Sequence, residues 1–192
     1  MREGHGNHGP QEDPPPRPRR IGLLLTVAVL AFTIDLISKT IVVATLSHRP
    51  PVRLLDGLLT LRMLRNSGAA FIIGTSLTVV FTLIAVTVII SILRTSRRLR
   101  SLPWAITLGL LLGGATGNLG DRLFRSPGPL RGHVVDWIQL PHFAVFNVAD
   151  SSIVCGGVLA VLLAARGVRL DGTRDLPRTT PQDAPAAGGS ST

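Results

Sequence analysis

Four long stretches without a charged residue decide what this chain of 192 residues can fold into. An α-helix rises 1.5 Å per residue, so about 20 residues cross the hydrocarbon core of a bilayer. The uncharged stretches approach that length, and the mean hydropathy of the chain is positive, at +0.39. Extended slightly at their ends, they predict four membrane-spanning helices, near residues 21–45, 69–93, 102–120 and 146–165.

The net charge of +9 raises the question of a nucleic-acid partner. The basic residues are nearly all arginines that flank the predicted spans, and no aromatic residues or binding motif accompany them, so we expect no nucleic-acid binding. Positive residues concentrate in cytoplasmic loops of membrane proteins. The distribution therefore predicts that both termini and the 94–101 loop are cytoplasmic.

The two ends of the chain differ from the middle in composition. Residues 1–20 and 167–192 are rich in small, polar and proline residues, so we expect two disordered cytoplasmic tails around a membrane domain over 21–166. Cys155 is the single cysteine, which excludes a disulfide or a cysteine-based metal site.

The loop of residues 46–68 has the pattern of a hairpin. Asp56-Gly57 is a turn signal between two short apolar runs, and a second extended stretch is expected over 132–140. An open sheet edge does not lie in the hydrocarbon core. The fold class predicted is an all-α membrane protein with four transmembrane helices and a small extracytoplasmic β-sheet element on the membrane surface.

The unusual polar residues of the chain fall at one end of this topology. Carboxylates at membrane depth are expensive to place, so each is a candidate functional residue. With the N-terminus inside, the polar residues at the ends of the spans and in the 121–150 region all come to the extracytoplasmic side. They are Asp35, Lys39, Asn66, Asn118, Asp121, Arg122, Asp136, Asn147 and Asp150.

Structural roles compete with functional ones for several of these residues. Asp35 and Lys39 are spaced i, i+4 and are expected to pair on one helix. Asn147 is placed to cap the fourth span, with Asp150 in its first turn, where the helix dipole favours a carboxylate. Asp136 has the weakest structural alternative, because it stands in an extended apolar stretch. No histidine pair has metal-ligand spacing, so a carboxylate pair is the remaining catalytic constellation.

Five short motifs occur in the order and spacing of a known family. Over about residues 20–165 the chain resembles the bacterial lipoprotein signal peptidases, the signal peptidase II family. The motifs are Asp35-Leu-Ile-Ser-Lys39, Asn66-Ser-Gly-Ala-Ala-Phe71, Gly113-Gly-Ala-Thr-Gly-Asn-Leu-Gly-Asp-Arg122, Val134-Val-Asp-Trp137 and Phe146-Asn-Val-Ala-Asp150. Trp137 stands where the family commonly has Phe, and the 137–145 loop is short.

The resemblance implies an aspartic endopeptidase of the bacterial cytoplasmic (inner) membrane that uses no metal or cofactor. Its substrates are prolipoproteins, cleaved just before a diacylglyceryl-modified cysteine, and we expect a monomer surrounded by membrane lipids. Carried over to this chain, Asp136 and Asp150 are catalytic. The site-shaping residues are Asn66, Asn118, Asp121, Arg122 and Asn147, and the structural supports are Asp35, Lys39, Gly68, Gly114 and Gly117.

Two other interpretations of the same residues remain open at this point. A four-helix transporter or proton channel would also use intramembrane carboxylates, but would spread them through the membrane depth. A non-catalytic scaffold would associate through Gly109, Gly113 and Gly117, whose four-residue spacing lets membrane helices approach closely. Two nearby carboxylates that share one proton instead favour acid–base hydrolysis.

Overall fold

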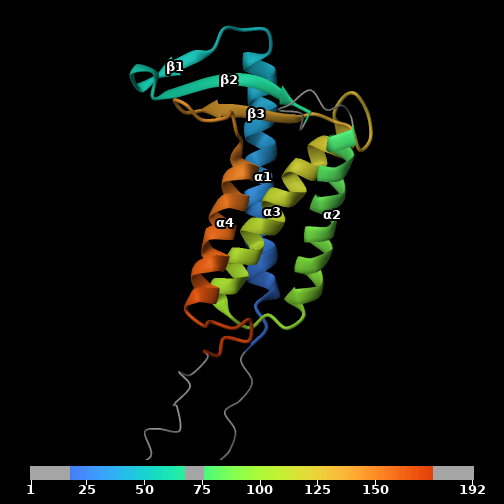
Figure 1. Ribbon diagram of the computed structural model, residues 1–192, viewed down its shortest axis with the longest axis vertical. Helices are drawn as coiled ribbons and strands as arrows, with labels where there is room; N and C mark the ends of the chain where they lie inside the picture. Colours follow the sequence, from blue (N-terminus) through green and yellow to red (C-terminus); the bar gives the residue numbers. More distant parts are fainter. Residues whose placement is uncertain (1–17, 68–75, 175–192) are drawn as a thin grey trace, which may run out of the picture.

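A computed structural model describes residues 18–67 and 76–174. Its four helices stand side by side as a bundle, and a small sheet lies across one end (Figure 1). The predictions for Gly68 and for residues 1–17 and 175–192 lie outside the described residues. The helices are α1 (Ile21–Leu46), α2 (Ser76–Ser96), α3 (Leu102–Phe124) and α4 (Val148–Ala165).

The four predicted spans are confirmed as helices long and apolar enough to cross a membrane. The largest difference in their described bounds is at the end of α3, which continues to Phe124 rather than stopping near residue 120. The added turn contains Asp121, and this carboxylate is ion-paired within the bundle. Because its charge is neutralised there, the helix does not have to end before it.

α3 is the central helix of the bundle. In its most apolar window 56% of residues are buried, compared with 17–22% in the other three helices. A Cβ atom built on Gly109 or Gly113 would lie 2.8 Å or 2.7 Å from a main-chain oxygen of α1. The predicted close helix contact at these two glycines is therefore found within one chain, between α3 and α1.

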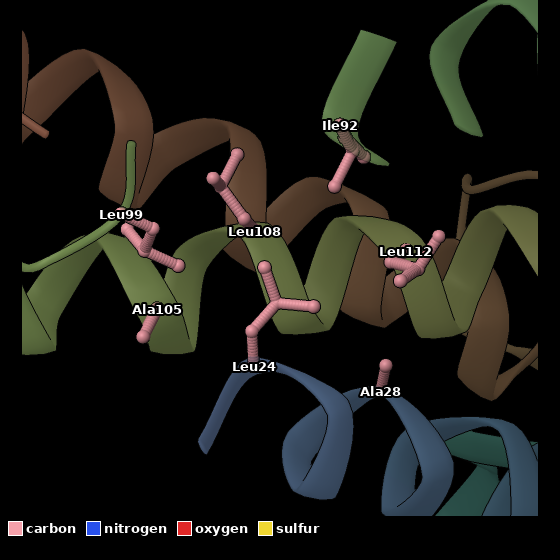
Figure 2. Close-up of a cluster of buried hydrophobic side chains, with 7 residues drawn as sticks. All are labelled: Leu24, Ala28, Ile92, Leu99, Ala105, Leu108 and Leu112. Atoms are coloured by element: carbon pink, nitrogen blue, oxygen red, sulfur yellow. The ribbon is translucent and has the colours of Figure 1, made fainter. Parts of the chain in front are cut away.

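The apolar core lies at the half of the bundle away from the sheet. Figure 2 shows Leu24 and Ala28 of α1 beside Leu108 and Leu112 of α3, with Ile92 of α2 close to them. All of these side chains are buried. This packing leaves the opposite half of the bundle for polar groups.

The expected small sheet is present and has three antiparallel strands in the order β1-β2-β3. They are β1 (Val52–Leu54), β2 (Leu59–Asn66) and β3 (Val134–Gln139). The hairpin turn at Asp56-Gly57 is confirmed, but it is a three-residue 3₁₀ turn that begins at Leu55. In Figure 1 the β1–β2 hairpin extends sideways beyond the helices, while β3 crosses above the bundle.

The chain remains structured beyond residue 166, where the sequence predicted a tail to begin. The indole nitrogen of Trp104 donates to the carbonyl oxygen of Val168 at 2.7 Å, and the main-chain nitrogens of Arg100 and Ser101 both donate to Leu170 at 2.9 Å. A bridge between Val168 and Arg174 closes the segment. Residues 167–174 thus form a loop fixed to the start of α3, because their carbonyl groups accept from the Trp104 indole and from the two main-chain nitrogens that precede the helix.

Candidate active site

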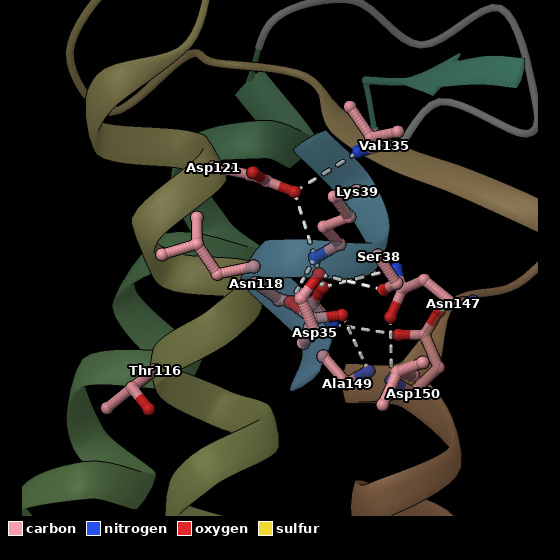
Figure 3. Close-up of polar contacts among 12 residues, drawn as sticks. Asp35, Ser38, Lys39, Thr116, Asn118, Asp121, Val135, Asn147, Ala149 and Asp150 are labelled. Carbon is pink, nitrogen blue, oxygen red and sulfur yellow. Dashed lines mark hydrogen bonds and ion pairs between the residues drawn. The ribbon is translucent and has the colours of Figure 1, made fainter. Parts of the chain in front are cut away.

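The sheet and the helix ends bring the predicted polar residues together. β3 passes from the end of α3 to the start of α4, and it pairs with β2 so that Leu64 is opposite Asp136. Asp35 and Lys39 reach the same region from the middle of α1. Figure 3 shows side chains of α1, α3 and α4 and the main chain of β3 joined by hydrogen bonds and ion pairs.

Lys39 is the cation at the centre of this network. Its ammonium nitrogen lies 2.7 Å from an oxygen of Asp35, which confirms the predicted i, i+4 pair, and 2.9 Å from an oxygen of Asp121. Both Lys39 and Asp35 are 1% exposed. The contact with Asp121 was not predicted, and Asp121 also pairs with Arg125, the residue that follows the end of α3. The i, i+4 spacing of Asp121 and Arg125 is the signal that indicates this second pair.

Lys39 also fixes the orientation of the Asn118 amide. The side-chain oxygen of Asn118 accepts a hydrogen bond from Lys39 at 3.1 Å and another from Asn147 at 3.3 Å. An ammonium group only donates, so the oxygen of Asn118 must face it. The nitrogen of the same amide then donates to Asp150, at 2.8 Å.

Asn147 and Asp150 form the start of α4. The side-chain oxygen of Asn147 accepts from the main-chain nitrogen of Asp150 at 2.9 Å, and the Asp150 carboxylate accepts from the main-chain nitrogen of Asn147 at 3.1 Å. This reciprocal capping box confirms the predicted N-cap. The helix N-terminus carries partial positive charge and stabilises a negative charge on Asp150.

Asp136 is buried on β3, with 1% of its surface exposed. One carboxyl oxygen accepts from the amide of Asn66 at 2.8 Å and the other from the amide of Asn147 at 2.6 Å. Burial raises the pKa of Asp136 to about 6, and the charge of Asp150 also raises it, while the two amide donors act in the opposite direction. This carboxyl therefore keeps its proton at a higher pH than an exposed aspartate does.

Asn147 connects the two candidate catalytic aspartates. Its amide nitrogen donates to Asp136, and its oxygen and main-chain nitrogen bond to Asp150. A carboxyl that can hold a proton near neutral pH thus lies close to a carboxylate at a helix N-terminus. That is the arrangement needed for one group to donate a proton while its neighbour accepts one.

The remaining predicted residues take supporting positions. Arg122 donates to the main-chain oxygen of Asn118 at 3.3 Å, and its guanidinium carbon lies 5.8 Å from the centre of the Phe81 ring. A Cβ atom on Gly114 would lie 2.5 Å from the main-chain oxygen of Ala149, and one on Gly117 would lie 2.6 Å from the Asp35 carboxylate. These two glycines let α3 approach the first turn of α4 and the buried ion pair.

Within residues 18–67 and 76–174, no group of three His, Cys, Asp or Glu side chains is placed to hold a metal ion.

Fold and site together define a multi-pass membrane protein with a buried cluster of aspartate, asparagine and lysine side chains at one end of its helix bundle. The family model for signal peptidase (SPase) II matches residues 27–166. On this match and on the relatives described next, the chain belongs to the signal peptidase II family.

Curated relatives and solved structures agree with this assignment. The chain is 55% identical over 155 residues to the lipoprotein signal peptidase of Streptomyces coelicolor, covering 81% of this chain and 76% of the relative. It is 47% identical over 169 residues to that of Mycobacterium tuberculosis, covering 88% and 83%. It also resembles a bacterial membrane enzyme determined by the in meso method at 1.9 Å resolution, with a TM-score of 0.68 and 27% identity over 78% of this chain and 96% of that one.

Proposed function

We propose that this protein removes signal peptides from prolipoproteins as an aspartic endopeptidase, with Asp136 and Asp150 as its acid–base pair. Removal of these signal peptides follows from membership of the family. The observation that supports the aspartic chemistry is the convergence of the two carboxyl groups on the side chain and main chain of Asn147.

The proposed reaction uses one protonated and one ionised carboxyl group. Asp150, at the helix N-terminus, takes a proton from the attacking water, while protonated Asp136 donates a hydrogen bond to the scissile carbonyl oxygen. The raised pKa of Asp136 supports this division of roles. As the tetrahedral intermediate breaks down, Asp150 gives the proton it took from water to the leaving amine and the amide bond is cleaved, which returns Asp150 to its ionised form and leaves Asp136 protonated.

The amide side chains around the pair act as positioning groups. Asn66 and Asn147 hold the Asp136 carboxyl, and Asn118 holds that of Asp150. Lys39 and Asp35 support this arrangement from behind, because Lys39 fixes the amide of Asn118 and Asp35 accepts from the first turn of α4 at Ala149. We propose a monomeric enzyme, in which the side chains that hold the pair all come from one chain.

The proposed substrate carries a diacylglyceryl-modified cysteine and is cleaved just before it. The site lies where the bundle meets the surface sheet (Figures 1 and 3), so acyl chains can remain in the bilayer while the peptide reaches the carboxyl groups. The arginine distribution supports an extracytoplasmic site in the bacterial inner membrane, with cytoplasmic termini. A proton channel is not favoured, because the described carboxylates of the spans gather toward one end of the bundle.

The test is cleavage of a purified diacylglyceryl-modified prolipoprotein by the purified protein in detergent. We expect Asp136→Asn and Asp150→Asn each to lower the cleavage rate by at least about 10²–10⁴-fold, which is the range of acid–base catalysis. Asp171→Asn is the matched control, because it removes an exposed carboxylate from the other end of the bundle. Thermal unfolding establishes that each variant is folded. Wild-type cleavage by a folded Asp136→Asn or Asp150→Asn protein would exclude the pair.

A further inference from the structure

The end of the bundle opposite the sheet is strongly basic. The described residues there include a single carboxylate, Asp171, which accepts hydrogen bonds from the main chain and hydroxyl of Thr173 at 2.8 Å and 2.6 Å. The same end contains nine described arginines: Arg19, Arg20, Arg94, Arg97, Arg98, Arg100, Arg166, Arg169 and Arg174. None of the functional residues discussed above lies at this end.

Several of these arginines surround a cavity of about 1100 Å³. Arg20, Arg100, Arg166 and Arg174 line it, and the described residues of its lining include no carboxylate. Arg20, Arg166 and Arg174 take part in none of the ion pairs that the described residues form. Leu102 and Leu163 add apolar surface where the cavity meets the spans.

Two helix starts add to the positive potential of this cavity. α1 begins directly after Arg20 and α3 directly after Ser101, and neither helix has an acidic residue in its first turn. A cation beside a helix N-terminus is unfavourable, because the helix dipole places positive charge there. The side chain of Ser101 makes no capping hydrogen bond, and Pro103 has no N–H to donate. An anion in the cavity would offset the positive charge at the starts of both α1 and α3.

The walls of the cavity are held together by hydrogen bonds. The main-chain nitrogen of Arg20 donates to Leu99 at 3.0 Å, which joins α1 to the α2–α3 loop. Trp104 donates to Val168, and Ser101 to Leu170, which fixes the 167–174 loop against α3. The arginines are therefore attached to a connected frame.

We propose that this cavity binds the phosphate group of an anionic membrane phospholipid. A phosphate oxyanion matches arginine side chains and helix N-termini in both charge and hydrogen-bonding geometry. Free phosphate shares this chemistry, but Leu102, 48% exposed, and the adjoining apolar spans favour a phosphate that carries acyl chains. Basic pockets between membrane helices bind such headgroups in other proteins. The proposal depends on the chain spanning a membrane and not on the peptidase mechanism.

The test measures lipid binding by the purified full-length protein in a neutral detergent. Phosphatidylglycerol, phosphatidylcholine and inorganic phosphate are titrated separately, and Kd is obtained from the shift in thermal unfolding. We expect phosphatidylglycerol to bind more tightly than phosphatidylcholine. The double variant Arg166→Gln/Arg174→Gln should weaken phosphatidylglycerol binding about 25-fold, since each arginine near an anionic lipid contributes a factor of about five.

Arg97→Gln/Arg98→Gln is the matched control, because it removes two arginines from the same end that do not line the cavity. We expect it to keep wild-type binding. Equal affinity for the two lipids, or an equal loss in the control variant, would overturn the proposal. Stabilisation by inorganic phosphate equal to that by phosphatidylglycerol would also overturn it and would indicate a free-phosphate site. If the double variant does not fold, Arg174→Gln alone, outside the helices, gives the same comparison.

Discussion

Amide groups, rather than cations, are the direct partners of the two candidate catalytic aspartates. Asn66, Asn118 and Asn147 supply the side-chain donors, while Lys39 lies behind Asn118 and pairs with Asp35 and Asp121. A cation in direct contact would hold a carboxylate ionised, because opposite charge favours the charged form. Neutral donors leave a carboxyl group able to gain and lose a proton. The separation of the lysine from the pair is therefore consistent with acid–base work.

The pH dependence of cleavage follows from the state of Asp136. Its pKa is raised to about 6, chiefly by burial, so the protonated form required by our proposal is lost as the pH rises above this value. We expect kcat/KM to fall on the alkaline side of about pH 6. Asn66→Ala removes a donor that lowers this pKa, so the fall should move to higher pH. An unchanged profile, or one shifted to lower pH, would contradict the role of Asp136.

The same carboxyl group links folding stability to pH. Because its folded pKa exceeds its ordinary value of 3.8, the folded state holds more protons than the unfolded state between pH 4 and 6. Its contribution to stability is fully present below pH 3.8 and is lost as the pH rises through 6. The stability of wild type relative to Asp136→Asn should fall by about 3 kcal/mol over this interval. Thermal unfolding of both proteins across the range measures it, and a difference independent of pH would show an unshifted group.

At the scale of single residues, the sequence identifies the polar residues of the site better than it predicts the contacts between them. The Asp35–Lys39 pair and the Asn147 cap were predictable because both form within one turn of a helix. The contact of Lys39 with Asp121 was not, since it depends on how α1 and α3 are rotated about their axes. The dual contact of Asn147 with Asp136 and Asp150 likewise requires the path of β3, which no local pattern specifies.

Among the helices, α3 determines how closely the other elements approach the site. Its four-residue glycine spacing predicted close packing, but a spacing does not identify the partner helix. The structure divides the glycines between two partners: Gly109 and Gly113 meet α1, while Gly114 meets α4. The scaffold hypothesis of intermolecular association through Gly109, Gly113 and Gly117 is not needed, because α1 of the same chain lies against all three glycines.

Gly114→Ala should destabilise the protein by about 1–3 kcal/mol. The added Cβ atom would lie 2.5 Å from the main-chain oxygen of Ala149, and a packed helix backbone yields only at a cost of this size. Because Ala149 adjoins Asp150, cleavage should fall as well. Thermal unfolding and a cleavage assay measure the two effects.

Gly157→Ala provides the comparison for this prediction. Gly157 is within α4, and nothing lies within 4 Å of a Cβ atom built on it. Alanine in a helix interior is favoured over glycine by about 0.5–1 kcal/mol, so this variant should be slightly more stable than wild type. Equal destabilisation by both substitutions would mean that the contact with Ala149 is not the reason why Gly114→Ala destabilises the protein.

Across the whole molecule, the carboxylates are concentrated at one end of the bundle. The described carboxylates gather near the sheet, apart from Asp171, together with seven arginines, whereas nine described arginines lie at the other end with Asp171 alone. Four spans could be predicted from hydropathy alone, because the bilayer sets their length. The 167–174 loop could not, because its order depends on hydrogen bonds to the start of α3 rather than on its own composition.

This asymmetry predicts how the protein is oriented in the cell. With Cys155→Ser as background, a single cysteine is introduced either in the hairpin turn, as Asp56→Cys, or in the α2–α3 loop, as Arg98→Cys. A membrane-impermeant maleimide should label Asp56→Cys in intact spheroplasts and Arg98→Cys only after the membrane is opened. The reverse pattern would place the sheet and the candidate active site in the cytoplasm.

The side-chain oxygen of Asn118 accepts hydrogen bonds from Lys39 and Asn147 at once, and this shared acceptor has a consequence for inheritance. Substitution of Asn118 removes an acceptor from both Lys39 and Asn147, and substitution of Lys39 or Asn147 takes one of two donors from the buried Asn118 oxygen, so the harm of each change depends on which residues its neighbours carry. Replacement of these three residues in descendants of this chain would require several substitutions together, and the single-substitution intermediates would have low fitness. We expect lineages to keep or replace the trio as a block, whereas the arginines of the opposite end drift one by one.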